Sequence, residues 1–122
     1  MQTKFKISTT LRNILLNDTS VTDIVSNRIF PLYAEKDTAQ PFIVYQRDEY
    51  SKDYSKMGIY SETAKVVFTI VDDNYDRGCN LAEIVNNCLE GYHEDKLRIR
   101  LIDSTEEIAE NLFLQVLLFE IN

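Results

Sequence analysis

The chain has 122 residues, of which 20 are acidic and 13 are basic, so its net charge is −7. This length suits one ordinary domain, which we expect to span residues 1–122 and to bury a substantial core. The hydrophobic content of 44% and the charged content of 27% argue against a disordered chain. The 3 glycines leave no room for a phosphate-binding loop, and no apolar run reaches the ~18 residues of a transmembrane helix.

The acidic residues are concentrated in the second half of the chain. Residues 61–122 hold 13 acidic and 5 basic side chains, whereas residues 1–60 hold 7 acidic and 8 basic ones. Affinity for nucleic acid comes largely from cations that neutralise phosphates. The charge therefore disfavours sequence-specific or duplex-binding roles, and a solubilising surface is its simplest explanation.

Two helices are predicted near the N-terminus. The segment Lys4–Asn17 repeats apolar residues at the spacing of one helical face, namely Ile7, Leu11, Ile14 and Leu15. The sequence Ser20–Asp23 resembles a capping box and predicts a short helix over Val21–Ser26. The next segment, Arg28–Tyr33, is apolar but contains Pro31, which favours a sheet edge or a loop over a central strand.

A long hairpin is predicted in the middle of the chain. Phe42–Arg47 has strong β propensity, and the polar stretch after it leads to an expected turn at Lys56–Gly58. The return strand is expected over Tyr60–Asp72, where alternate positions form one apolar face: Ala64, Val66, Phe68 and Ile70.

A third helix and a second hairpin complete the order. Acidic and Asx side chains in Asp72–Asp76 indicate the start of a helix that ends at Gly91. Two strands are expected over Lys96–Ile102 and Leu112–Ile121, joined by a polar acidic connection over Asp103–Glu110. The sequence therefore predicts an α+β fold, in which an N-terminal helix is followed by the order β-β-α-β-β. Its four strands form one antiparallel sheet with two helices packed on one face.

Residues that support catalysis or metal binding are sparse. Residues 72–83 match six positions of an EF-hand loop, but Arg77 stands where its sharp turn needs glycine, so helix capping is the preferred interpretation. The only histidine, His93, lies in an expected loop without a recognisable nucleophile. Cys79 and Cys88 are about 13 Å apart along one predicted helix, too far for a disulfide. We therefore predict no catalytic, metal-binding or cofactor-binding residue, and a protein that is not an enzyme.

The central hairpin carries the most suggestive side chains. Its tyrosines alternate with charged residues, and tyrosine is enriched in protein–protein interfaces. We treat one set of hairpin residues as a candidate interface, namely Arg47, Tyr50, Lys52, Tyr54 and Lys56. The alternative is a solvent-exposed hairpin whose aromatic side chains have no binding role.

The order of the segments is itself informative. A first helix, TTLRNILLND, is followed by SVTDIVSNRIFPLYAEKDTAQPFIVYQ, which contains a short helix, an R-I-F-P piece, a polar loop and a P-F-I-V-Y-Q strand. A strand and helix, VVFTIVDDNYDRGCNLAEIVNNCLEG, and a closing strand pair come next. This order resembles the tail completion proteins of long-tailed phages and prophages, also called tail terminator or tail-to-head joining proteins. The resemblance spans nearly the whole chain and departs at the tyrosine-rich hairpin and the acidic connection.

The resemblance implies a non-enzymatic virion protein without cofactors. Related proteins form a hexameric ring that stops growth of the tail tube at its head-proximal end. The implied partners are further copies of the chain, the tail tube protein and the head–tail connector protein. DNA passes through such a ring, no membrane is involved, and the implied location is the tail neck of a virion assembled in the host bacterial cytoplasm. The acidic residues expected to face the channel or a docking surface are Asp103, Glu106, Glu107 and Glu110.

Three other roles compete with this one. A monomeric adaptor would use a sheet edge to bind a single partner without forming a ring. Another small neck protein, such as a head-completion protein, would fit the same size and lack of catalytic motifs. A small hydrolase is the third, and the missing nucleophile–base set argues against it.

Overall fold

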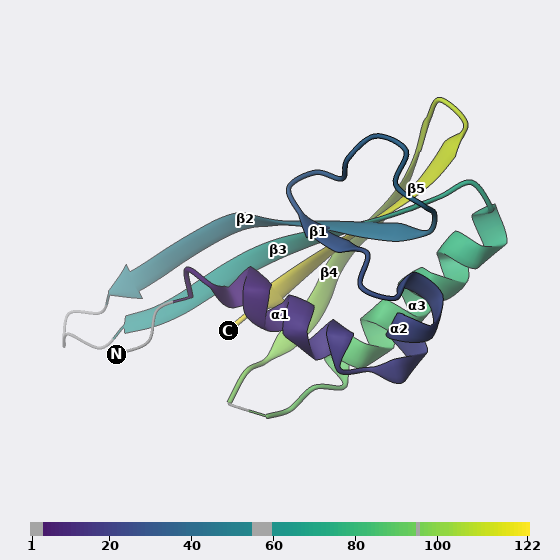
Figure 1. Cartoon of the computed structure of the whole chain (residues 1–122). Helices are drawn as coiled ribbons and strands as arrows, with labels where there is room; N and C mark the ends of the chain where they lie inside the picture. The colour runs from purple at the N-terminus through teal and green to yellow at the C-terminus, as the bar shows by residue number, and fades with distance from the viewer. Residues whose placement is uncertain (1–3, 55–59, 95) are drawn as a thin grey trace.

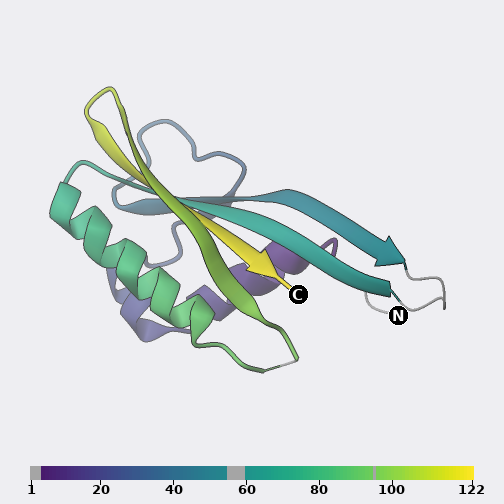
Figure 2. The same cartoon turned by 180° about the vertical axis from the view of Figure 1, so that it is seen from behind.

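The computed structural model describes residues 4–54, 60–94 and 96–122, and it has one open sheet with three helices on a single face (Figures 1 and 2). The α+β class is as predicted. The elements in chain order are α1 (Ile7–Leu16), α2 (Thr19–Val25), β1 (Ile29–Pro31), β2 (Phe42–Tyr54), β3 (Tyr60–Asp72), α3 (Tyr75–Glu90), β4 (Ile99–Ala109) and β5 (Leu112–Ile121).

The sheet has five strands in the order β1-β2-β3-β5-β4, so the prediction of four strands was wrong by one. The additional strand, β1, is three residues long and pairs in parallel with β2, whereas the other neighbours are antiparallel. It forms the edge of the sheet. Pro31 lacks a backbone N–H, and at an edge no further strand needs that hydrogen bond. The sequence predicted either a sheet edge or a loop for this segment, and the structure shows the edge.

The acidic segment is a strand, and its prediction as a connection was wrong. β4 continues from Ile99 to Ala109 and pairs with β5, with Asp103 opposite Leu118 and Glu107 opposite Leu114. Residues 102–109 are exposed, because β4 is the outermost strand. A strand that is exposed on both faces needs no alternation of apolar and polar residues, so its sequence reads as a loop.

The helices follow the predicted apolar spacing. The buried residues of α1 are Ile7, Leu11 and Leu15, and those of α3 include Leu81, Val85 and Leu89. Asp18 is the N-cap of α2, where its carboxylate accepts a hydrogen bond from the Ser20 backbone N–H at 2.9 Å. The predicted capping box at Ser20–Asp23 therefore begins two residues too late. No described helix combines the length and hydropathy needed to cross a membrane.

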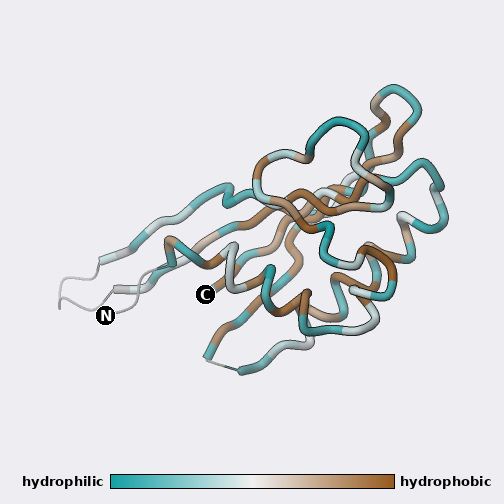
Figure 3. The backbone as a smooth tube through the Cα atoms, viewed as in Figure 1, coloured by the Kyte–Doolittle hydropathy of each residue, from teal (hydrophilic) through white to brown (hydrophobic). Residues whose placement is uncertain are grey.

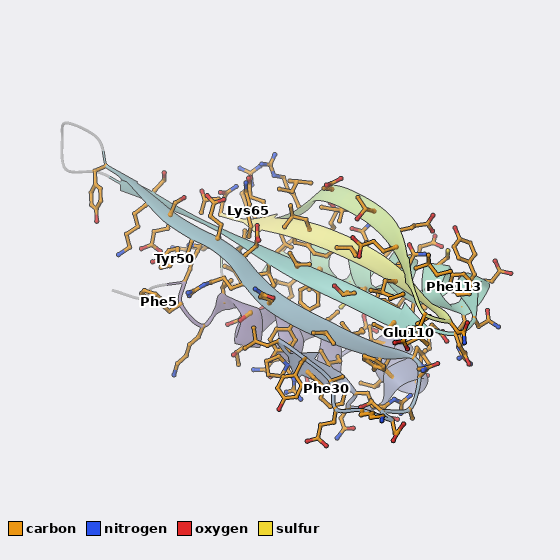
Figure 4. All side chains as sticks on the ribbon, turned by 90° about the horizontal axis from the view of Figure 1, so that it is seen from above. Phe5, Phe30, Tyr50, Lys65, Glu110 and Phe113 are labelled. Atoms are coloured by element: carbon orange, nitrogen blue, oxygen red, sulfur yellow. The ribbon has the colours of Figure 1, made fainter. Side chains whose placement is uncertain are left out.

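Strand alternation gives the sheet a covered face and an open face. The covered face packs on α1, α2 and α3, and its central side chains are fully buried, among them Val66, Phe68, Ile70 and Phe119. The open face carries no helix (Figure 4) and is apolar at its centre, with half-buried Val44, Val67, Val116 and Leu118. Figure 3 shows the same separation, with hydrophobic segments along the middle of the sheet and hydrophilic ones at the far end of β2 and β3.

Two adjacent valines of β3 test this assignment of faces. We expect Val66→Ala to lower the free energy of unfolding by about 2 kcal/mol, because Val66 is fully buried and its loss leaves a cavity. Val67→Ala removes the same two methyl groups from the half-exposed open face and should cost less than about 1 kcal/mol. Urea unfolding of both variants measures the difference. Equal losses would contradict the assignment.

Candidate interaction surfaces

The hairpin of β2 and β3 extends well beyond the rest of the sheet. The pairing of β3 with β5 begins only at Ala64, opposite Ile121, whereas β2 and β3 pair as far as Tyr54 and Tyr60. We call residues 47–54 together with 60–63 the arm. Figures 1 and 2 show it projecting past the helices at one end of the molecule. The predicted turn at Lys56–Gly58 lies outside the described residues.

The N-terminal segment packs under the arm through an aromatic and cationic cluster. The Arg47 guanidinium lies 5.0 Å from the centre of the Phe5 ring and 5.9 Å from that of Tyr50. The Phe5 and Tyr50 rings meet edge to face, with their centres 5.0 Å apart, and Figure 4 labels both residues beside the arm. Arg47 Nη1 also donates a hydrogen bond of 3.1 Å to the Phe5 carbonyl. These contacts tie the start of α1 to the root of the arm.

Two lysines share one carboxylate further along the same face. Lys4 Nζ and Lys52 Nζ lie 3.6 Å and 3.8 Å from the carboxylate oxygens of Glu62. Arg47, beside Tyr50 on the same face, adds a third cation, so cations outnumber the Glu62 carboxylate here and this face of the arm is basic. The structure brings the predicted interface residues Arg47, Tyr50 and Lys52 together here. Sequence reasoning missed Lys4, Phe5 and Glu62, because contacts distant in the chain leave no local periodic signal.

The two remaining residues of the predicted interface set lie further out. Tyr54 is in the same strand parity as Tyr50 and Lys52, and it is 72% exposed. Lys56 lies outside the described residues.

A hollow lies beside the root of the arm. Its volume is about 510 Å³, and its lining residues are Phe5, Ser8, Pro31, Leu32, Tyr45, Gln46 and Arg47. It exists because β1 ends at Pro31, so β2 has no described neighbour on that side beyond Tyr45. Phe5 and Leu32 are 61% and 66% exposed. The hollow therefore has a mixed lining, in which apolar Phe5, Pro31 and Leu32 lie with polar Ser8 and Gln46 and the Arg47 cation.

The opposite end of the molecule is acidic. Residues 72–77 at the start of α3 and residues 103–114 of the β4–β5 hairpin hold seven acidic side chains and a single basic one, Arg77. We call these two segments the acidic end. Figures 1 and 2 show the β4–β5 turn projecting there, away from the arm. The molecule therefore has a basic aromatic face at one end and an excess of negative charge at the other.

The four predicted acidic residues do not share one surface. Glu106 turns toward α3, where its Oε2 accepts hydrogen bonds from Tyr75 Oη at 2.5 Å and Gln115 Nε2 at 2.7 Å. The hydrogen bond from Tyr75, and after it the one from Gln115, lower the pKa of Glu106. Asp103 and Glu107 lie in the opposite strand parity, on the open face. Glu110 lies at the exposed turn, with φ of 58°.

A buried ion pair anchors the start of α3. Asp72 is fully buried and accepts hydrogen bonds from Arg77 Nε at 2.7 Å and Arg77 Nη2 at 2.5 Å, and from the Asn74 backbone N–H at 3.2 Å. Burial raises the pKa of Asp72, but these hydrogen bonds and the Arg77 charge outweigh it, so the pKa is lowered. Asn74 caps α3 by accepting from the Arg77 backbone N–H. This confirms the capping interpretation of the EF-hand-like residues.

The cysteines and the histidine form no reactive set among the described residues. Cys79 and Cys88 are half-buried on α3, and neither forms a disulfide, as predicted. Burial, together with a hydrogen bond to Asp18, raises the pKa of Cys88 to about 12, so its thiol stays protonated at neutral pH. His93 is exposed after α3. No group of three or more His, Cys, Asp or Glu side chains in the described part of the chain is placed to hold a metal.

Comparisons with known proteins give matches to solved structures but none to a family model or a curated protein sequence. A chain in a solved structure described as the virion of native gene transfer agent (GTA) particle superposes with a TM-score of 0.78 at 13% sequence identity. The match covers 91% of this chain and 89% of the other. It shows that the two chains share a fold over nearly their whole length.

The aromatic cluster makes a prediction about the arm. We expect Phe5→Ala to lower the free energy of unfolding by about 1–2 kcal/mol, because it removes the cation–π contact with Arg47 and the edge-to-face contact with Tyr50. Amide hydrogen exchange in the arm should accelerate. Tyr33→Ala is the control, since it removes a ring that is 70% exposed. Unchanged exchange in the arm of the Phe5 variant would contradict this account.

The buried carboxylate predicts a pH-dependent stability. The folded pKa of Asp72 lies below the ordinary value of 3.8, so its stabilisation is complete above about pH 4 and is lost as the pH falls through the lower folded value. Asp72→Asn should cost about 1–3 kcal/mol at neutral pH, and that cost should shrink in acid. Urea unfolding across the acid range measures it, with the exposed Asp76→Asn as control. A cost that does not change with pH would refute the assignment.

Proposed function

We propose that the chain is a non-enzymatic structural protein of a phage, a prophage or a phage-like virion, which caps the head-proximal end of the tail tube and joins tail to head as a hexameric ring. The observation that carries the proposal is the whole-length fold likeness to a chain of a gene transfer agent virion. The ordered sequence segments that resemble tail completion proteins support the more specific role at the end of the tail tube.

The shape and the charge of the protomer suit this role. A ring needs two different surfaces on each copy that fit one another, because identical patches give closed dimers instead. The basic face of the arm and the acidic end lie at opposite ends of the molecule and carry opposite charge. A protein that caps the tail tube needs surfaces that bind other proteins, and it needs no reacting groups.

The acidic strand suits a channel that DNA crosses. Asp103, Thr105 and Glu107 share the open face of β4, and residues 101–122 contain no lysine or arginine. Negative charge repeated around a ring repels DNA phosphates, so a genome passes without binding. In this proposal Asp103 and Glu107 line the channel or the surface that docks on the connector, in the tail neck of the virion, whereas Glu106 holds β4 to α3.

A monomeric adaptor is the second candidate. The outer edge of β4 has no described neighbour along 11 residues, and a free edge of this kind accepts an additional strand from a partner. Light scattering at high protein concentration separates the candidates. A ring-forming protein associates with itself at high concentration or when it binds tail tubes. An adaptor stays a monomer at high concentration and in the presence of tail tubes.

Negative-stain microscopy with purified tail tubes tests the proposal. We expect ring-shaped density at one end of each tube after the protein is added, and tubes that no longer elongate. Tubes with bare ends at saturating protein would refute the tail-capping role.

Neutralising the acidic residues of β4 tests the proposed channel. The variant carries Asp103→Asn and Glu107→Gln, the carboxylates on the open face of β4. We expect slower DNA ejection because repulsion of the DNA phosphates is lost, or weaker head joining because the docking surface loses its charge. A matched variant with Asp23→Asn and Glu83→Gln makes the same change in charge at exposed positions elsewhere. Particles with normal assembly and ejection for the β4 variant would show that these carboxylates have no such role.

A further inference from the structure

The two ends of the molecule differ in charge, and one carries an exposed isoleucine at its tip while the other carries a hollow. We infer that the β4–β5 tip of one copy, residues 107–111, seats Ile108 in the hollow beside the arm of the next copy. This contact rests on the self-association in the proposed function and names the two surfaces that would meet. The partner is a second copy of this chain.

The tip presents an apolar side chain among carboxylates. Ile108 is 69% exposed, in the part of β4 that is exposed on both faces, so its side chain is available for a contact. Glu107 precedes it, and Glu110 follows at the turn. The hydrogen bonds from Tyr75 and Gln115 to Glu106 fix the strand just before the tip, so Ile108 is held outward at little entropic cost on binding.

The hollow supplies the complementary chemistry. Its apolar walls include Phe5 and Leu32, which are 61% and 66% exposed and would be covered by a seated isoleucine. Arg47 lines the hollow, and Lys4 and Lys52 lie along the same face of the arm. A volume of about 510 Å³ accommodates one apolar side chain together with the acidic residues that flank it. Carboxylates beside these cations would gain attraction that strengthens at low salt.

The contact has to be between molecules. Figure 4 shows Phe5 and Glu110 on opposite sides of the molecule, so the tip of one copy cannot reach the Phe5 side of its own hollow. Tip-to-tip pairing is opposed by like charges, because residues 101–122 contain no basic residue. Tip-in-hollow contact is therefore head-to-tail, and repetition of it gives a ring or an open filament.

Cysteine crosslinking between two different variants tests the contact directly. A protein carrying Ile108→Cys is mixed with one carrying Leu32→Cys under mild oxidation, and we expect a disulfide-linked dimer that contains one chain of each kind. Asp23→Cys replaces an exposed residue of α2 and is the matched control in place of Leu32→Cys. The unsubstituted chain, with Cys79 and Cys88, reports background crosslinking. Equal dimer yields with the control, or none with either, would overturn the inference.

Substitutions at the tip give a second readout. Ile108→Asp should weaken self-association by about tenfold or more, since it places a further carboxylate at the centre of an apolar contact. Ile102→Asp is the control, because Ile102 is 41% exposed on the same strand but lies away from the tip. Glu107→Lys with Glu110→Lys should also weaken association, and Asp23→Lys with Glu35→Lys should not.

The two proposals fail in different ways. Rings on tail tubes that persist unchanged with Ile108→Asp would overturn the tip-in-hollow contact and leave the capping role intact. Tip-in-hollow crosslinks without any binding to tail tubes would support the contact and overturn the capping role. Melting temperatures of all variants near that of the parent chain ensure that the effects come from association and not from unfolding.

Discussion

The packing of α1 and α3 against the β2–β3–β5 ladder is the contact on which the rest of the molecule depends. It buries one face of the sheet around Leu11, Phe68 and Phe119, all fully shielded from solvent. The helices cover only the middle of the strands, so both hairpins extend past the covered area (Figures 1 and 2). A two-stranded extension is marginally stable by itself, and each one therefore needs local contacts to hold it.

Both extensions are held by the start of a helix. Phe5 precedes α1 and contacts Arg47 and Tyr50 at the root of the arm. Tyr75 is the first residue of α3 and donates its hydroxyl hydrogen bond to Glu106 on β4. Since both helices belong to the packed layer, the directions of the arm and the β4–β5 tip are fixed relative to the same core. The surfaces at the two ends are therefore placed by one set of buried contacts.

The sequence predicted the parts of the fold that bury one face. The spacing in α1 and α3 and the alternation in β3 and β5 follow directly from burial, and the observed bounds of β3 and β5 agree with the prediction. β4 was mistaken for a loop, because an edge strand exposed on both faces has no apolar period. For the candidate surfaces, the sequence predicted which residues belong to them but not how those residues are arranged. The geometry of the arm depends on Glu62, which pairs with Lys52 across 10 residues of the chain, and on Phe5, which contacts Arg47 across 42.

The angle between the two ends decides what a head-to-tail contact builds. Each head-to-tail contact rotates one copy relative to the next by the same angle. The copies close into a ring when a whole number of these rotations completes a full turn, and otherwise they form a filament. The ladder is interrupted between Arg47 and Glu49 at the root of the arm, and between Leu101 and Asp103 in β4. Such β-bulges increase local twist and bend the strand that carries them. One extra residue in each projecting hairpin thus adjusts the angle between hollow and tip, and in the proposed assembly this angle determines the number of copies that close the ring.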